Sequence, residues 1–379
     1  MNLELLTERF RENFSKRGEL GASVSVWEAG REVLSLADGY CDREQTQPWT
    51  SDTPVLFWSA TKGMTAGCIL HACQEARIPL SRTVSEFWPE FGAGGKEGIT
   101  IAQLMSHQAG LASISRPVPV LDYQAVTEAL AAEPPHWPLG EGHGYHPRTF
   151  GFLLDELLRR ITGGATVRDY WRKIFAEPLG LHLWIGMPSE GLEEVAPVFP
   201  ARSTPPKGDI FYTAFLTAGS LTAAAFASPK GLHSASAMNS PEARSASLPG
   251  FGGIGTASSL AKYYALLAAR GSLDGRRYFS SETLGQMTTT LSQAHDRVLH
   301  LETAFSAGFM KDPITADGRK IRAIFGPSPR AFGQPGAGGS HAFADPDRQI
   351  AFAYVMNQME PGVLPNDKAL CLIDALYSF

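Results

Sequence analysis

Two residues near the start of the chain have the types and the spacing of a serine nucleophile and its base. Ser59 and Lys62 form an S-x-x-K sequence. At positions i and i+3 of a helix, the hydroxyl and the amine share one face and can meet. A neutral lysine beside a serine can accept the hydroxyl proton and so activate the oxygen for attack on a carbonyl carbon.

The flanking sequence separates this pair from a second S-x-x-K sequence at Ser259–Lys262. Residues 54–58 (PVLFW) and the residues after Lys62 are mostly apolar, which predicts a serine at the N-terminus of a buried helix. There the backbone N–H groups and the helix dipole favour a developing oxyanion. Ser259 begins a helix with a surface pattern, where Ser258 or Ser259 is predicted to be the N-cap.

A serine–lysine site also needs a second proton carrier and a second oxyanion donor. Tyr145 lies in the glycine-rich segment 142–147 (GHGYHP), just before a predicted helix. Its phenol would lose a proton more easily beside a cationic Lys62. Residues 334–340 (QPGAGGS) allow close backbone approach just before a predicted strand. These two segments are therefore the candidates for the proton carrier and the backbone donor.

Four segments, in this order, carry a resemblance to the serine β-lactamase-like superfamily. They are Ser59–Lys62, residues 104–111 (LMSHQAGL), Gly144–Tyr145 and Gln334–Gly336. Within the superfamily, the chain looks most like the family VIII carboxylesterases and related class C and penicillin-binding-protein-like proteins. The resemblance covers nearly the whole chain and implies a serine β-lactamase-like fold, with a helical domain inserted into an α/β domain.

The same resemblance implies a role for each matched residue. Ser59 would be the acylated nucleophile, and Lys62 and Tyr145 would share the base and acid work. The backbone N–H groups of Ser59 and Ala337 would form the oxyanion hole. No cofactor and no metal are expected.

The chain departs from the β-lactamase pattern in two motifs. Pro147 replaces the asparagine of Tyr-x-Asn, and Gln334-Pro335-Gly336 replaces Lys-Thr-Gly. A lysine there offers a positive charge to the carboxylate of a β-lactam or peptide. Gln334 offers a neutral amide, and Pro335 lacks both a hydroxyl and a backbone donor. These changes favour ester hydrolysis over penicillin recognition.

The predicted activity is hydrolysis of small carboxylic esters through an acyl-enzyme on Ser59. The side chains and backbone predicted to contact the substrate are those of Trp58, Tyr123, His143, Gln334 and Gly336, and parts of 209–227 are candidate walls. β-Lactamase, D-alanyl peptidase or acyltransferase activity would use the same residues. A non-catalytic, ligand-binding descendant of the fold is the alternative from another class.

Other enzyme classes fit the sequence poorly. An α/β-hydrolase orders its triad as serine, acid and histidine, and no histidine follows His341 after the nearest nucleophile candidate, Ser340. His143 and His146 form a lone H-x-x-H without a third metal ligand, so they either tune the pocket or are exposed loop residues. His107 is predicted to bond backbone around a turn. The segment Gly252–Gly255 lacks the preceding strand and the spacing of a nucleotide loop.

Composition and charge limit the kinds of binding partner and the cellular compartment that we expect. The 379 residues carry 33 basic and 38 acidic side chains, a formal net charge of −5, and no basic stripe that would indicate nucleic-acid binding. Residues 1–17 mix charge into every turn, and Ile210–Ser228 is diluted by glycine and threonine, so neither predicts a membrane segment. The four cysteines form no ligand pair. We therefore expect a cytoplasmic protein with a small-molecule substrate and no membrane partner; the oligomeric state stays open.

The two ends of the chain predict one sheet. Strands are predicted at 22–27, 32–37, 340–344 and 350–356, with amphipathic helices at both termini. The fold class is therefore α/β of the α+β type: an antiparallel sheet from both chain termini, flanked by helices, with an inserted mainly helical domain. The predicted domains are 1–60 plus 305–379 for the sheet and 61–304 for the helices. Residues 197–250 are predicted to be irregular, either a surface excursion or a pocket wall.

Overall fold

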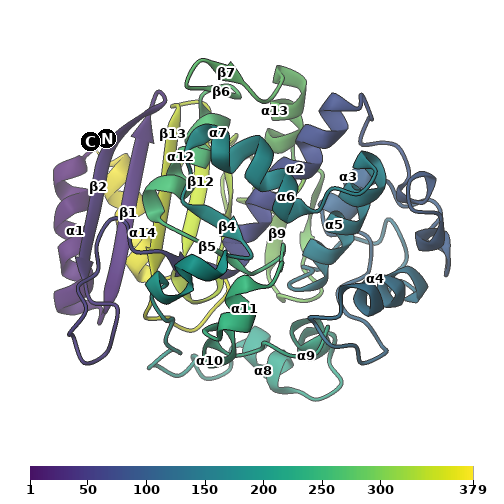
Figure 1. The fold of residues 1–379 in the computed structure, drawn as a ribbon, viewed down its shortest axis with the longest axis horizontal. Helices are drawn as coiled ribbons and strands as arrows, with labels where there is room; N and C mark the ends of the chain where they lie inside the picture. Colours follow the sequence, from purple (N-terminus) through teal and green to yellow (C-terminus); the bar gives the residue numbers. More distant parts are fainter. Residues whose placement is uncertain (379) are drawn as a thin grey trace.

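The computed structural model describes residues 1–378 and contains an eight-stranded sheet in which every neighbouring pair is antiparallel (Figure 1). Its strand order is β2-β1-β13-β12-β11-β10-β9-β8. The strands are β1 (Gly21–Glu28), β2 (Arg31–Gly39), β8 (Ser292–His295), β9 (Glu302–Phe305), β10 (Met310–Lys311), β11 (Phe332–Pro335), β12 (His341–Asp345) and β13 (Ile350–Met356).

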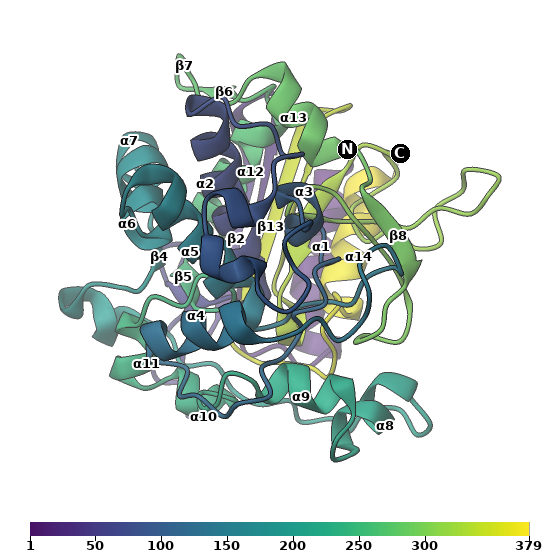
Figure 2. The same ribbon diagram turned by 90° about the vertical axis from the view of Figure 1, so that its right-hand side faces the viewer.

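The two ends of the chain meet inside this sheet, which confirms the predicted α/β class. Strand β1 pairs with β2 on one side and with β13 on the other, with Val24 opposite Tyr354. Helices α1 (Leu3–Lys16) and α14 (Asp367–Tyr377) cover one face, and α12 (Ala257–Ala268) covers the other (Figure 2). The predicted terminal helices and strands are thus all present.

Strand β13 shows why the sheet can be covered on both faces. Phe352 and Tyr354 point into the cluster beneath α1 and α14, whereas Ala351 and Ala353 belong to the core on the α12 side. Successive side chains of a strand alternate between faces. Large rings therefore fill one layer, and small alanines let α12 pack close to the sheet on the other.

The helical layer surrounds α2 (Thr61–Glu75), which is buried from Thr61 to Cys73. A helix that is apolar all round belongs in a core. Gly63 and Gly67 face the hydroxyls of Tyr264 and Tyr263, where an added Cβ would come within 2.2 and 2.0 Å. The other α-helices here are α3 (Ile101–Met105), α4 (Tyr123–Ala132), α5 (Thr149–Thr162), α6 (Val167–Trp171), α7 (Glu177–Leu179) and α13 (Ser281–Thr288).

Short elements complete the fold. Strands β3 (Val55–Leu56), β5 (Gly253–Gly255) and β4 (Leu183–Ile185) form a small sheet, and β6 (Ser272–Leu273) pairs with β7 (Arg276–Arg277). The short 3₁₀-helices are η1 (Trp58–Ala60), η2 (Val84–Glu86), η3 (Pro89–Gly92), η5 (Ser189–Glu194) and η6 (Ala337–Gly339), and η4 (Arg172–Ala176) is a short π-helix.

Three boundary predictions need correction. The sheet layer begins before residue 305, because α12, β8 and β9 belong to it. Strand β8 is a polar edge strand with a half-exposed pattern, so it carries no hydrophobic signal. Residues 197–250 include four short helices: α8 (Ile210–Leu216), α9 (Leu221–Ala227), α10 (Ala235–Met238) and α11 (Pro241–Ser245). The N-cap of α12 is Thr256, which accepts the Ser259 N–H, rather than Ser258 or Ser259.

Within residues 1–378, no single helix is long and apolar enough to cross a membrane. Helices α8 and α9 reach that length only as a pair, which is bent by 68°.

The alternation in β13 predicts where the sheet is most sensitive. Phe352→Ala removes a buried ring from a packed layer and should lower the free energy of unfolding by about 3–5 kcal/mol. Val33→Ala, on the exposed side of β2, should change it by no more than about 0.5 kcal/mol. Urea titrations of both variants measure the difference, and equal effects would contradict the layer assignment.

Candidate active site

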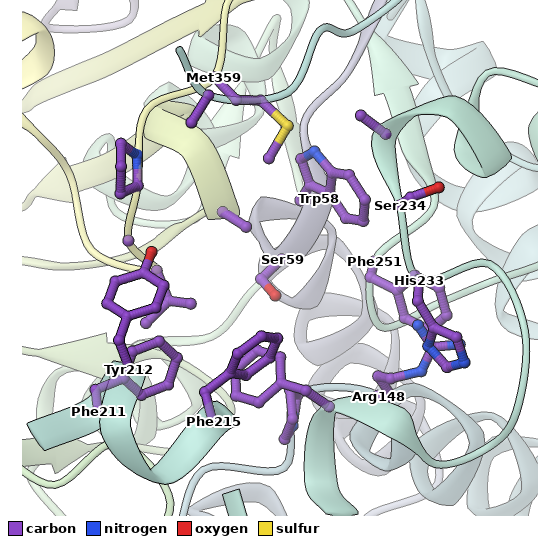
Figure 3. Close-up of a pocket in the computed structure, with 18 of the residues that line it drawn as sticks. Trp58, Ser59, Arg148, Phe211, Tyr212, Phe215, His233, Ser234, Phe251 and Met359 are labelled. Atoms are coloured by element: carbon purple, nitrogen blue, oxygen red, sulfur yellow. The ribbon is translucent and has the colours of Figure 1, made fainter. Parts of the chain in front are cut away.

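The serine of the first S-x-x-K lies where β3 passes into α2. Strand β3 is held by β5, and the Phe57 N–H donates to Gly253 O at 3.1 Å. Trp58 then adopts a left-handed backbone with φ of +48°, which is uncommon for a residue with a large side chain. Ser59 follows in η1 and lines a cavity (Figure 3). The local backbone strain thus sits directly beside the candidate nucleophile, as is common at functional sites.

Lys62 is fully buried, and three oxygens surround its amine. Nζ lies 3.0 Å from Ser59 Oγ and donates to Pro147 O and Gly250 O at 2.8 Å each. An uncharged amine has two N–H donors and one lone pair. Because the two carbonyls take both donors, the lone pair of a neutral Lys62 faces the Ser59 hydroxyl.

The surroundings of Lys62 favour this neutral form. Among residues 1–378, no carboxylate lies within 4.0 Å of its amine. Burial holds the pKa of Lys62 well below its usual value, and the positive charge of Arg148 lowers it further. Lys62 is therefore built as a base rather than as half of an ion pair.

Tyr145 is the third predicted catalytic residue, and it lies beside Lys62 and Gln334. Its ring centroid lies 4.9 Å from Lys62 Nζ, and its hydroxyl accepts an N–H from Gln334 Nε2 at 3.2 Å. Burial raises the pKa of Tyr145, although hydrogen bonds from Ser59 and Gln334 act in the opposite direction. The expected easing of phenol proton loss by a cationic Lys62 is not seen, since burial is the largest influence on the pKa of Tyr145 and raises it. A protonated Tyr145 suits a proton carrier.

Strand β11 brings the second backbone donor to the serine. The end of β11 lies against η1, and a Cβ at Gly336 would come within 2.2 Å of Phe57 O, so a glycine is required there. Ala337 follows and lines the same cavity as Ser59. Within residues 1–378, neither the Ser59 nor the Ala337 backbone N–H donates to another protein group. Two unpaired donors at one cavity fit the predicted oxyanion hole.

An unpredicted residue, Asp296, holds the loop that carries Tyr145. Both of its carboxylate oxygens accept the Tyr145 N–H, at 3.0 and 3.1 Å. Oδ1 also accepts the N–H groups of Val298 and Leu299, at 2.8 and 2.9 Å. Asp296 is fully buried in the β8–β9 connection. No local pattern links it to a loop 151 positions earlier, so only the folded structure reveals this anchor.

The three histidines near Tyr145 are buried, which excludes the interpretation of His143 and His146 as exposed loop residues. His146 accepts the Leu111 N–H at 2.9 Å, and burial lowers its pKa to about 3. His107 Nδ1 accepts the His146 N–H at 3.1 Å, which confirms the predicted bond to backbone at a turn. His143 contacts the hydroxyls of Ser292 and Thr303 at 2.6 Å each and does not line the cavity, which corrects its prediction as a substrate contact.

Three further predicted substrate contacts lie elsewhere. Tyr123 donates its hydroxyl proton to Glu156 at 3.0 Å and packs beneath Arg159, outside the cavity. Gln334 and Gly336 are buried behind Tyr145 and Phe57. Their side chain and backbone position catalytic groups and do not line the cavity. Trp58 does line it, as predicted.

The cavity in front of Ser59 has a volume of about 600 Å³. Much of its wall comes from 197–250, which favours the pocket-wall interpretation of this segment over a surface excursion. Figure 3 shows Ser59 between two sides of the cavity. One side carries Phe211, Tyr212 and Phe215, and the other carries Arg148, His233 and Phe251. Sequence reasoning missed Met359 and Val363, which follow β13 and join the lining.

The second S-x-x-K is structural. Ser259 Oγ accepts the His182 N–H at 2.9 Å. Lys262 donates to Leu179 O and pairs with Asp274, both at 2.9 Å. Its amine therefore serves packing contacts with a carbonyl and a carboxylate.

The depressed pKa of Lys62 predicts how the reaction rate of Ser59 depends on pH. Attack by Ser59 requires the free amine, so the reaction should speed up as pH rises through the pKa of Lys62, which lies below the usual lysine value. Arg148→Gln removes a positive charge, raises that pKa, and should shift this acid limb to higher pH. The measurement is the rate at which a fluorophosphonate probe labels Ser59 between pH 5 and 10. Arg244→Gln serves as the control, and an unshifted limb in Arg148→Gln would contradict the electrostatic account.

Asp296 predicts a coupled effect on stability and reactivity. Asp296→Ala leaves three buried N–H groups without an acceptor, at about 1–3 kcal/mol each, and should lower the melting temperature strongly. Asp296→Asn keeps one acceptor oxygen and should fold. Measured at temperatures far below the melting temperature, its Ser59 labelling rate should still fall, since the amide has one acceptor oxygen fewer to hold the Tyr145 N–H. An unchanged rate in the folded variant would assign Asp296 a purely structural role.

Comparison with known proteins agrees with this geometry. The family model described as Beta-lactamase matches residues 6–374. Esterase/beta-lactamase LipL of Mycobacterium tuberculosis is 33% identical over 373 residues, covering 95% of this chain and 82% of the relative.

Two solved structures have the same fold over their full length. A penicillin-binding protein homologue from Caulobacter crescentus has a TM-score of 0.88 and 34% identity, covering 99% of this chain and 97% of its own. A family VIII carboxylesterase has a TM-score of 0.89 and 31% identity, with the same coverage. The predicted resemblance and fold are confirmed, and the chain belongs to the β-lactamase family of serine hydrolases.

Proposed function

We propose that the protein is a carboxylesterase that hydrolyses small carboxylic esters through an acyl-enzyme on Ser59. The observation that carries the proposal is the buried Lys62 amine, which lies 3.0 Å from Ser59 Oγ and 2.8 Å from each of two backbone carbonyl oxygens. The esterase names of two relatives agree with this activity.

Acylation follows from the positions of four groups. Ser59 Oγ attacks the ester carbonyl carbon while its proton passes to Lys62 Nζ. The carbonyl oxygen becomes an oxyanion and accepts the Ser59 and Ala337 N–H groups. As the ester C–O bond breaks, Tyr145 gives its proton to the leaving alkoxide and takes one from the Lys62 ammonium. The alcohol leaves, and the acyl group stays on Ser59.

Deacylation runs through the same groups in reverse order. Water takes the place of the alcohol and gives a proton to the Lys62–Tyr145 pair as its oxygen attacks the acyl carbon. The second oxyanion collapses, the Ser59 ester bond breaks, and Ser59 Oγ regains its proton. The carboxylic acid leaves the cavity, and the site returns to its starting state.

The Gln334-Pro335-Gly336 segment favours ester substrates over β-lactam substrates. Gln334 donates to Tyr145 and is buried, so it offers no charge to a substrate carboxylate in the way that a lysine would. The largely aromatic wall from α8 and α9 suits apolar acyl groups. β-Lactam hydrolysis is a second candidate, because the Mycobacterium tuberculosis relative is named for both activities.

Substrate panels with two serine variants test the proposal. Wild type should hydrolyse p-nitrophenyl acetate, butyrate and octanoate and cleave little nitrocefin. Ser59→Ala removes the nucleophile and should cut turnover by at least about 10³-fold. Ser259→Ala, the matched control in the structural S-x-x-K, should retain it. Lys62→Ala and Tyr145→Phe should each lower the rate by roughly 10²–10⁴-fold.

Each result of that panel has a clear consequence. Loss of activity in Ser259→Ala, or its retention in Ser59→Ala, would mean that the wrong serine is assigned. Strong nitrocefin turnover would favour the β-lactamase alternative. A folded wild type that cleaves none of the esters would overturn the carboxylesterase proposal.

A further inference from the structure

Arg148 is a buried cation in the wall of the catalytic cavity. It is 5% exposed, and it lines the same cavity as Ser59. Within residues 1–378, no Asp or Glu oxygen lies within 4.0 Å of its guanidinium. The amines of the partly buried Lys320 and the buried Lys368, by contrast, have carboxylates at 2.7 and 3.2 Å. An ion buried without a counterion is costly, so its presence calls for a compensating group.

The guanidinium is held in one orientation by neutral partners. Nη1 donates to Leu232 O at 3.1 Å, and Nη2 donates to Gly231 O. The charged carbon lies 4.6 Å from the centre of the Phe251 ring. Nε is buried without a partner in the described chain. Carbonyls and a ring can orient a guanidinium, but they do not neutralise it.

The remaining charged and titratable groups of the cavity do not supply the missing anion. Glu360 also lines the cavity, but it is paired with Lys368 at 3.2 Å and hydrogen-bonded to Ser203 at 2.8 Å. His233 stands beside Arg148 (Figure 3), and its Nε2 accepts the Gly231 N–H at 2.8 Å. The free charge facing the substrate space is therefore positive and comes from Arg148.

We propose that Arg148 is a specificity-determining residue that binds a carboxylate of the substrate, so that the preferred esters carry an acid group at one end. The inference rests on the proposed ester hydrolysis and narrows its substrate class. A carboxylate offers two oxygens to the planar fork of donors on a guanidinium, and such charge-assisted bonds are strong. Because Ser59 and Arg148 share one cavity, a single substrate can reach both.

Kinetics on matched esters test the charge preference. One arm uses mono-p-nitrophenyl esters of dicarboxylic acids with four to eight carbons, each compared with its methyl-capped, uncharged diester. The other arm places the acid on the alcohol side, with 4-acetoxybenzoate compared with its methyl ester. The quantity measured is the ratio of kcat/KM for the charged ester to that for the neutral one. Wild type should favour the charged ester by about tenfold or more on one arm, as expected from a charge-assisted hydrogen bond.

Three arginine variants separate recognition from packing. Arg148→Gln should lower the ratio by about tenfold or more, whatever its effect on absolute rates. Arg148→Lys keeps the charge and should give an intermediate ratio. Arg244 also cross-links the wall region, since Nη1 donates to Leu192 O at 2.9 Å, but it does not line the cavity. Arg244→Gln should therefore keep the wild-type ratio.

A binding measurement keeps this test independent of turnover. Calorimetry with Ser59→Ala should show tighter binding of monomethyl glutarate than of dimethyl glutarate. The double variant Ser59→Ala/Arg148→Gln should lose that difference.

The outcomes of the two tests are distinguishable. A wild-type ratio of one or less on both arms, or a ratio that survives in Arg148→Gln, would overturn the inference while leaving ester hydrolysis intact. If no ester is cleaved, the proposed function fails, and the calorimetry alone decides whether Arg148 binds carboxylates.

Discussion

The site depends on one amine that is buried without a carboxylate. Lys62 is enclosed by two backbone carbonyls and the hydroxyl of Ser59. Burial in such a place disfavours the ammonium form, and nearby Arg148 disfavours it further. An acidic side chain in place of either carbonyl would stabilise the ammonium form of Lys62. The amine could then no longer accept the Ser59 proton. The chemistry proposed for Ser59 therefore follows from how three separate segments close around one nitrogen.

Three elements of the site are each held by a different part of the fold. Helix α2 lies in the core and places Ser59 and Lys62 on one face. Asp296, in the β8–β9 connection, fixes the loop that supplies Pro147 O and Tyr145. Strand β11 brings Gly336 against Phe57 and leaves Ala337 at the cavity. The antiparallel sheet is thus part of the site, because β11 carries one of the two proposed oxyanion donors to the cavity.

Sequence patterns predict what is local in this molecule. The S-x-x-K at Ser59, the loop at Tyr145 and the strands at both chain ends depend on short spacing and alternation, and the structure shows them as predicted. Long-range contacts leave no such pattern. Asp296 is one buried acid far from Tyr145, and Tyr123 and His143 pack away from the cavity for reasons that only tertiary neighbours reveal. The polar edge strand β8 likewise lacks a run of apolar residues that would predict a strand, since half of its side chains are exposed.

The protonation state of Lys62 is the most direct test of this account. Protein labelled with ¹³C at lysine Cε gives one resonance for this side chain, identified by its absence in Lys62→Ala. Its chemical shift should titrate with a pKa well below the ordinary lysine value of about 10.4. A resonance that titrates at or above the ordinary value would show that Lys62 is an ammonium ion at neutral pH, and the base assigned to Ser59 would then be wrong.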